Sequence, residues 1–140
     1  MELEVSTVID RPTSTVWDFC AVHHIENHPR WDPSVELEAT SDDPIGVGTI
    51  IKRRTNRFGN TTEGTMEIIE VQPERVMRSK TQDGPMTIYG KLLLEALGDN
   101  QTRLVMGGEF PDMDDSMKEK IRPLMERSAA NIKSLIESET

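Results

Sequence analysis

Cysteine and aromatic residues are scarce in this chain of 140 residues, which contains one Cys, two Trp, one Tyr and three Phe. The single thiol, that of Cys20, cannot form a disulfide within the chain, so the sequence fits a reducing compartment and we expect a cytoplasmic protein. With so few rings, a tightly packed aromatic core is not expected, and some open internal volume is compatible with the composition.

Long apolar segments and an excess of positive charge are missing as well. No run of about 18 apolar residues is present, so the sequence predicts no stable insertion into a membrane. The formal net charge is −9, whereas a general binder of nucleic acid or of anionic membranes needs a basic surface. We therefore expect no nucleic acid among the partners. Nothing in the sequence identifies a protein partner.

Motifs of nucleotide-binding loops, paired-cysteine metal sites and serine-hydrolase elbows are also absent, and no cofactor is expected. His24 and His28 lie four residues apart, a spacing that can hold zinc. No third ligand accompanies them, so packed or surface histidines are favoured and no metal is predicted. Cys20 is interpreted as an inert core thiol. The length favours a single domain over residues 1–140.

What is present is a regular succession of secondary-structure patterns. Residues 2–10 alternate apolar and polar side chains, as a half-buried strand does. Pro12 then suits the first turn of a helix, and a short helical segment over 22–28 is expected to end at Pro29. From Val35 on, six further strands bounded by turn residues are predicted: VELEAT, GTIIKRRTNRF, TTEGTMEIIEV, RVMRSKT, PMTIYGKLLLEAL and TRLVMGGEF.

The last part of the chain changes to helical periodicity. A stripe of apolar side chains predicts a long amphipathic helix, opened by aspartates between residues 112 and 115 near the positive end of its dipole. Pro123 lies inside this stripe and predicts a bend between segments 112–122 and 123–138. The first segment is a candidate ligand gate, and a static kink is the alternative. The elements together predict an α+β fold, with a curved antiparallel meander of about seven strands around this helix and two short helices after the first strand.

Four segments carry a resemblance to a known family: VIDRPTSTVWDF, HPRWDPSV, IIEVQPERV and DNQTRLVMGGEF. They resemble the START-like helix-grip superfamily, and within it most closely the polyketide cyclase/dehydrase-like branch. The resemblance spans essentially the whole chain, but its motifs are structural rather than catalytic. It implies a deep cavity between the curved sheet and the long helix, which commonly holds an apolar or amphipathic small molecule. Some members are enzymes and others are carriers.

Trp31 stands between Pro29 and Pro33, in a stiff connector that the resemblance places at the mouth of the cavity. There its ring either plugs the cavity or stacks on a ligand, or it packs the short helices onto the sheet. Packing is favoured, because a large buried aromatic side chain usually belongs to the core.

Arg53 is the most specific candidate for a polar contact with a ligand. A hairpin turning at Gly59-Asn60 pairs Arg53 with Met66, and the inward face is the one that carries Met66 and Ile68. Arg53 then points inward and is a candidate anchor for a carboxylate or enolate. The alternatives are an internal ion pair with Glu70 or Glu95, or a bulge that turns Arg53 outward.

Methionine is unusually frequent, with eight residues, and flexible thioethers suit a pocket that adapts to the shape of its ligand. They also fill irregular cores that bind nothing. The predicted ligand-binding residues are Trp31, Arg53, Met66, Met77, Ser79, Met86, Ile88, Met106, Met117, Ile121 and Met125.

Three functions remain open at this point. The favoured one is binding or carriage of a hydrophobic or amphipathic small molecule. The second is a polyketide cyclase or dehydratase that uses the same cavity, with Arg53, Ser79 or Tyr89 as the groups that handle protons, although Tyr89 has outward parity on its strand. The third is a protein-interaction module whose cavity is occluded.

Overall fold

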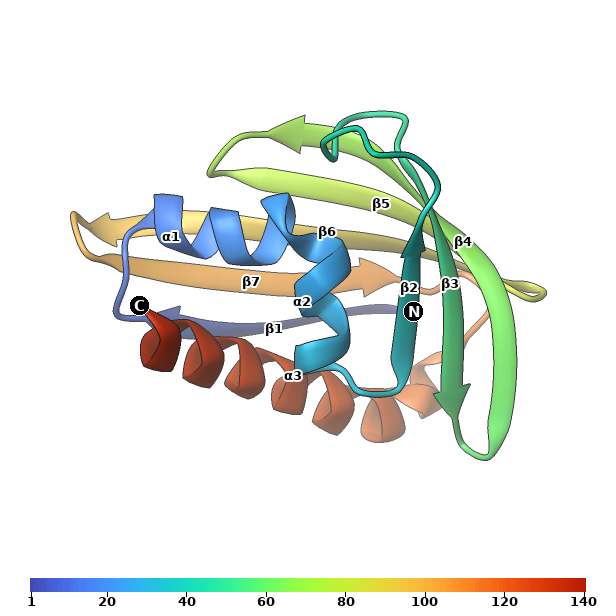
Figure 1. Ribbon diagram of the computed structural model, residues 1–140. Coiled ribbons are helices and arrows are strands. Elements are labelled where there is room, and N and C mark those ends of the chain that lie inside the picture. Colours follow the sequence, from blue (N-terminus) through green and yellow to red (C-terminus); the bar gives the residue numbers. More distant parts are fainter.

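A seven-stranded antiparallel sheet forms the body of the protein (Figure 1), which is described from a computed structural model of residues 1–140. The strand order is β1-β7-β6-β5-β4-β3-β2, so the chain forms a meander from β2 to β7 and β1 closes the edge beside β7. This confirms the predicted topology. The strands are β1 Glu2–Ile9, β2 Val35–Ala39, β3 Ile50–Arg57, β4 Asn60–Gln72, β5 Val76–Asp83, β6 Met86–Gly98 and β7 Gln101–Glu109.

The helices lie on one side of this sheet. After β1 come α1 (Thr13–Trp17), a π-helical turn η1 (Asp18–Val22) and α2 (His24–Trp31), and after β7 come a short 3₁₀ turn η2 (Asp115–Met117) and α3 (Lys118–Glu139). The long helix α3 packs along β1 and touches α2, while the sheet curves past them towards β2 and β3 (Figure 1). Register irregularities in β4 and β6 help such long strands to bend. The architecture is the predicted α+β helix-grip fold. No helix is both long and apolar enough to span a membrane.

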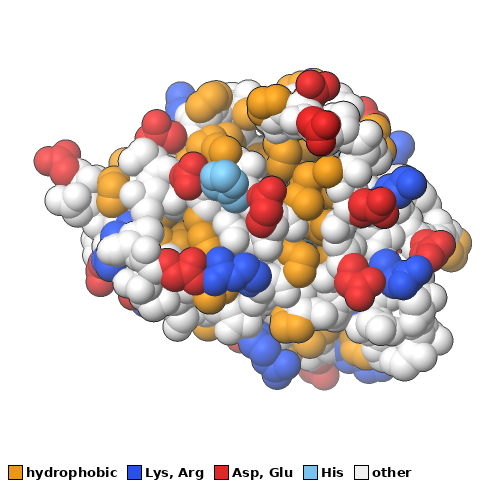
Figure 2. Space-filling model, viewed as in Figure 1, with side chains coloured by type: hydrophobic (Ala, Val, Ile, Leu, Met, Phe, Trp, Pro, Cys, Tyr) orange, Lys and Arg blue, Asp and Glu red, His pale blue; other side chains and the backbone are white.

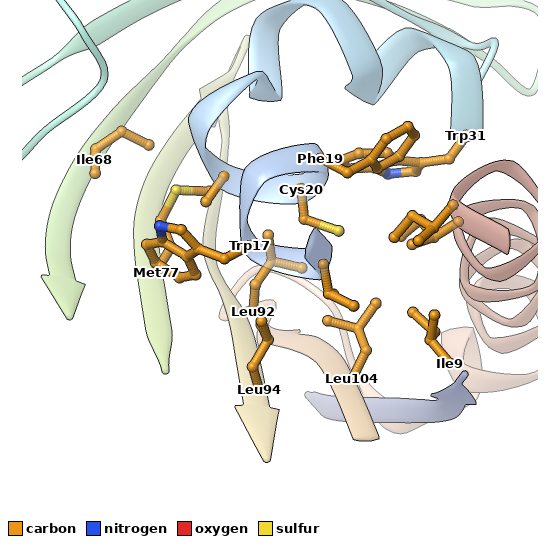
Figure 3. Close-up of a cluster of buried hydrophobic side chains, with 14 of the residues drawn as sticks. Ile9, Trp17, Phe19, Cys20, Trp31, Ile68, Met77, Leu92, Leu94 and Leu104 are labelled. Atoms are coloured by element: carbon orange, nitrogen blue, oxygen red, sulfur yellow. The ribbon is translucent and has the colours of Figure 1, made fainter. Parts of the chain in front are cut away.

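The hydrophobic core lies between the first helices, the sheet and the second half of α3. Trp17, Phe19 and Cys20 approach side chains of β1, β5, β6 and β7 in this cluster (Figure 3). Trp17 is therefore a core residue. Burial raises the pKa of the Cys20 thiol to about 12, so the thiol stays protonated and unreactive, as expected.

The first correction concerns the short helix that was expected over 22–28. Asp18–Val22 forms a π-helical turn, and α2 continues through Pro29 to Trp31. Proline removes only one backbone donor. The last turn is held by Asp32, whose N–H donates to the His28 carbonyl at 2.9 Å, and by the burial of Trp31.

The second correction concerns Pro123, because α3 is one uninterrupted helix from Lys118 to Glu139. The predicted start of the first segment at residue 112 is wrong, because α3 begins at Lys118 and continues through Pro123, whereas a bend at Pro123 stays a prediction. Residues before Asp115 are not helical, and the proline removes a single bond to the Glu119 carbonyl. Ile121 on one side of Pro123 and Ile132 on the other are both buried, so packing holds the helix together. Movement of the first turns as a gate stays a prediction.

The third correction concerns the β3–β4 hairpin. Its loop is Phe58-Gly59, both with positive φ, and Arg57 pairs with Asn60. Arg53 therefore pairs with Gly64 rather than with Met66, a shift of two residues. A shift of two keeps the same face inward. Arg53 points inward as predicted and is 8% exposed.

Figure 2 shows the face that carries α1 and α2, with acidic and basic side chains interspersed over it rather than gathered by sign.

Candidate functional site

A cavity of about 380 Å³ lies inside the grip, bounded by β3 to β7, by α2 and by α3 with the segment that precedes it. All eleven residues that the sequence predicted for the site line this cavity. The structure therefore places all eleven at the cavity, and their contact with a ligand stays a prediction.

The methionine side of the cavity consists of Met86, Met106, Met113, Met117 and Met125, which come from β6, β7, α3 and the segment before α3. All five are half-buried. Met66 and Met77 line the floor and are fully buried, so seven of the eight methionines of the chain face this one space. The surface they form is apolar and built from unbranched side chains, which change shape at little cost.

The polar side of the cavity consists of His24, His28, Arg53 and Asp83, contributed by α2, β3 and β5. Arg53 donates from Nε to the Asp83 carboxylate, at 2.9 Å to one oxygen and 3.2 Å to the other. Both side chains are less than a tenth exposed. The predicted alternative, an internal ion pair of Arg53, is confirmed. Its partner is Asp83, and the predicted partners Glu70 and Glu95 are wrong.

Gly64 explains why Asp83 is the partner. It lies between Arg53 and Asp83 in the sheet and is paired with both. Because glycine has no side chain, the Arg53 side chain can reach across β4 to the next strand but one. A Cβ atom at Gly64 would lie 1.8 Å from the Gln82 carbonyl oxygen, so the position requires glycine. The partners expected from sequence, Glu70 and Glu95, instead face outward and pair with other arginines (Arg78 and Arg103).

Arg53 also has unused donors. Neither of its Nη groups has a hydrogen-bond partner in the protein, and both keep some accessible surface. The hydroxyls of Thr55, Ser79 and Thr81 line the same cavity and make no hydrogen bond within the protein either. The ion pair therefore lies beside several polar groups that remain free.

His24 is 3% exposed and its ring is held in one orientation. Its Nδ1 lies 2.8 Å from the Cys20 carbonyl oxygen. A carbonyl only accepts, so Nδ1 carries the hydrogen and Nε2 keeps a lone pair. Burial lowers the pKa of His24 to about 4, because it outweighs the rise caused by the bond to the Cys20 carbonyl, and the positive charge of Arg53 adds a smaller lowering. The ring is therefore neutral near pH 7.

His28 lies one turn further along α2, with its ring centroid 4.7 Å from that of His24. Burial and the neighbouring His24 hold the pKa of His28 well below its usual value. Two ring nitrogens, His24 Nε2 and His28 Nδ1, are buried without any hydrogen-bond partner. The histidines are packed groups, and no three His, Cys, Asp or Glu side chains come together as a metal site.

Trp31 is 2% exposed and lies under these histidines. His28 stacks on it with ring centroids 5.0 Å apart, His24 meets it edge-on at 5.5 Å, and Phe19 lies at 5.9 Å (Figure 3 shows Phe19 and Trp31). Trp31 packs the short helices, as favoured from the sequence, and it also lines the cavity. Tyr89 is 40% exposed and outside the cavity, in agreement with its outward parity.

Sequence reasoning did not assign several of the lining residues to this site, among them His24, His28, Asp83, Arg57 and Met113. Asp83 follows Ser79 and Thr81 at the period of a strand, and this parity places it on the inward face. The histidines carried no comparable signal, because the π-helical turn before α2 changes the face that α2 turns inward.

Comparison with known proteins identifies the family. Residues 1–137 match the family described as polyketide cyclase/dehydrase and lipid transport. The chain belongs to this family. No curated protein sequence matches the chain significantly.

Several solved structures share the fold of this protein although their sequences are only distantly similar to it. A START superfamily protein from Mycobacterium smegmatis superposes with a TM-score of 0.81 at 13% identity, over 99% of both chains. The Zhui aromatase/cyclase of a Streptomyces species gives 0.72 at 15% identity, over 98% of this chain and 93% of the other. Norcoclaurine synthase from the plant Thalictrum flavum gives 0.72 at 15% identity, over 99% of this chain and 95% of the other.

Proposed function

We propose that the protein binds and carries a hydrophobic or amphipathic small molecule between the sheet and α3. The observation that carries this proposal is the cavity of about 380 Å³ whose lining includes seven of the eight methionines. Its volume lies in the range of cavities that hold small ligands, roughly 300–1,000 Å³. The family description, which includes lipid transport, supports the same proposal.

The test is binding of the uncharged fluorescent probe N-phenylnaphthylamine. We expect saturable binding by the wild type and loss of binding in Met86→Trp and Met125→Trp, because a bulky ring fills the cavity. Ile50→Trp is the matched control: Ile50 is on β3 but faces outward, at 38% exposure, so this variant should bind as the wild type does. Equal binding by all four proteins would show that the probe lies elsewhere and would contradict the proposal.

A second candidate function is cyclisation or dehydration of a reactive poly-β-ketone in the same cavity. The observation that favours it is the presence of three polar groups, Arg53, Ser79 and His24, in the lining of a largely apolar cavity. The aromatase/cyclase and the norcoclaurine synthase that share the fold are named as enzymes. An enzyme should form product, and Arg53→Met should abolish turnover while the probe still binds. A carrier should bind and form no product.

The interaction module is the least supported of the three functions. It requires an occluded cavity, whereas the cavity of this protein has a volume of about 380 Å³, which is large enough for a small ligand.

A further inference from the structure

The charged side chains that line the cavity are already paired. Arg53 pairs with Asp83, Arg57 with Asp32, and Lys91 with Glu4, which lies outside the cavity lining. Each cation thus has its own carboxylate. A charged group on a ligand would meet no unpaired opposite charge, and its desolvation would go without compensation.

Of the two buried ring nitrogens without a partner, only that of His24 has its role as an acceptor fixed by a bond within the protein. The bond from His24 Nδ1 to the Cys20 carbonyl leaves the Nε2 lone pair free, and this atom is buried. Buried polar atoms are nearly always hydrogen-bonded, because one left without a partner has lost its hydration without compensation. A ligand that donates a hydrogen bond to Nε2 would provide that compensation.

Donors line the same cavity. The Nη groups of Arg53 have no partner in the protein and keep some accessible surface. A hydroxyl group is the simplest ligand group that suits both kinds of atom, because it donates one hydrogen bond and accepts others. A carboxylate cannot donate, and its charge would lie near the lone pair of His24 and the carboxylate of Asp83.

We infer that the cavity selects an uncharged ligand with a hydroxyl group, which donates its hydrogen to His24 Nε2 and accepts from Arg53. This inference rests on the proposed function, because it names the class of molecule that the cavity takes. It also replaces the expectation from sequence that Arg53 anchors a carboxylate or enolate, since Asp83 already neutralises Arg53.

Three probes with the same ring system test the inference at neutral pH: a naphthol, its methyl ether and the corresponding naphthoate. The ether keeps the shape of the naphthol but cannot donate, and the naphthoate is an anion. We expect the wild type to bind the naphthol about tenfold more tightly than the ether, the factor that corresponds to one hydrogen bond of ordinary strength, and to bind the naphthoate most weakly. Calorimetry gives the three affinities.

His24→Phe keeps an aromatic ring and removes both nitrogens. We expect it to bring the naphthol to the affinity of the ether while the ether itself binds as before. His23→Phe is the control, because the side chain of His23 is 54% exposed and outside the cavity. It should leave the tenfold preference intact.

A measurement on the wild type makes the test independent of how well the His24 variant folds. The ¹⁵N resonance of His24 Nε2 should move when the naphthol binds and stay in place when the ether binds. Equal affinity for naphthol and ether with an unmoved resonance would overturn the inference but leave the proposed function standing, and so would tightest binding of the naphthoate. Failure of all three probes to bind would overturn both.

Discussion

The polar side and the methionine side of the cavity are built on different principles. On the polar side directional bonds fix two of the groups: Asp83 accepts from Arg53, and the Cys20 carbonyl accepts from His24. On the methionine side five half-buried thioethers meet the cavity without directional bonds. The first arrangement favours recognition of one chemical group, and the second favours tolerance of varied apolar shapes. The two sides thus assign specificity and adaptability to different strands and helices of the same fold.

The largest expected effect comes from breaking the ion pair on the polar side. Asp83→Ala leaves the Arg53 charge buried without a partner, and we expect the free energy of unfolding to fall by about 3–5 kcal/mol. Denaturant titration measures this loss. Glu70→Ala removes a carboxylate that pairs with Arg78 on the outer face, and the same measurement should show a loss of at most about 1 kcal/mol. The double variant Arg53→Met/Asp83→Leu should recover most of the stability, because no buried charge remains.

The second effect is a loss of stability in acid. The folded state lowers the pKa of His24 from 6.5 to about 4, so between these values the unfolded chain binds more protons. The stabilisation by neutral His24 is complete above pH 6.5, declines as the pH falls and is gone below about 4, with a total of about 3 kcal/mol. The folded state lowers the pKa of His28 as well. The positive charge of Arg53 lowers the pKa of His24, and the negative charge of Glu26 raises it.

Unfolding titrations at several pH values test this dependence. His24→Phe should flatten the slope of stability between pH 6.5 and 4, whereas His23→Gln, at an exposed position, should retain it. An unchanged slope in His24→Phe would mean that the acid sensitivity lies elsewhere.

The third effect concerns the residue that lets the polar side form. Gly64→Ala places a methyl group against the Gln82 backbone and beside the path of Arg53, so we expect a loss of about 1–3 kcal/mol. Gly46→Ala is the matched control, since a Cβ atom there meets nothing within 4 Å. Comparable losses in both variants would point to a general effect of glycine replacement.

The smallest effect is expected on the methionine side. Met117→Leu and Met125→Leu conserve volume and should change the free energy of unfolding by less than about 1.5 kcal/mol. We expect the stiffer side chains to narrow the range of ligand shapes, so that a flexible alkyl probe and a rigid polycyclic probe differ more in affinity than in the wild type. If the two probes keep their wild-type affinity ratio, thioether flexibility is not what accommodates varied shapes.

The parts of this architecture that follow from short-range periodicity were predictable from the sequence. Alternation in β3 and β4 was enough to turn Arg53 inward, because parity survives a register error of two residues. The error itself arose at the turn, where Phe58 adopts a left-handed conformation that favours glycine or asparagine. The helix was predicted in two pieces because Pro123 removes a bond, but packing of the same apolar stripe on both sides outweighs that local loss.

The polar side of the site depended on contacts that periodicity does not encode. Pairing Arg53 with Asp83 requires two registers at once and a glycine between them. The inward turn of His24 depends on the π-helical turn that precedes it, and no residue pattern in the sequence announced that turn.

The buried thiol of Cys20 has a practical consequence for kinetics. It is the only cysteine of the chain, it is fully buried, and its pKa of about 12 keeps it protonated. An alkylating reagent can therefore reach the thiol only during a transient opening of the core beneath η1. The rate of labelling then measures how often that opening occurs. The Cys20 carbonyl also orients His24. A ligand bound at His24 should therefore lower the rate of labelling although it makes no contact with the sulfur.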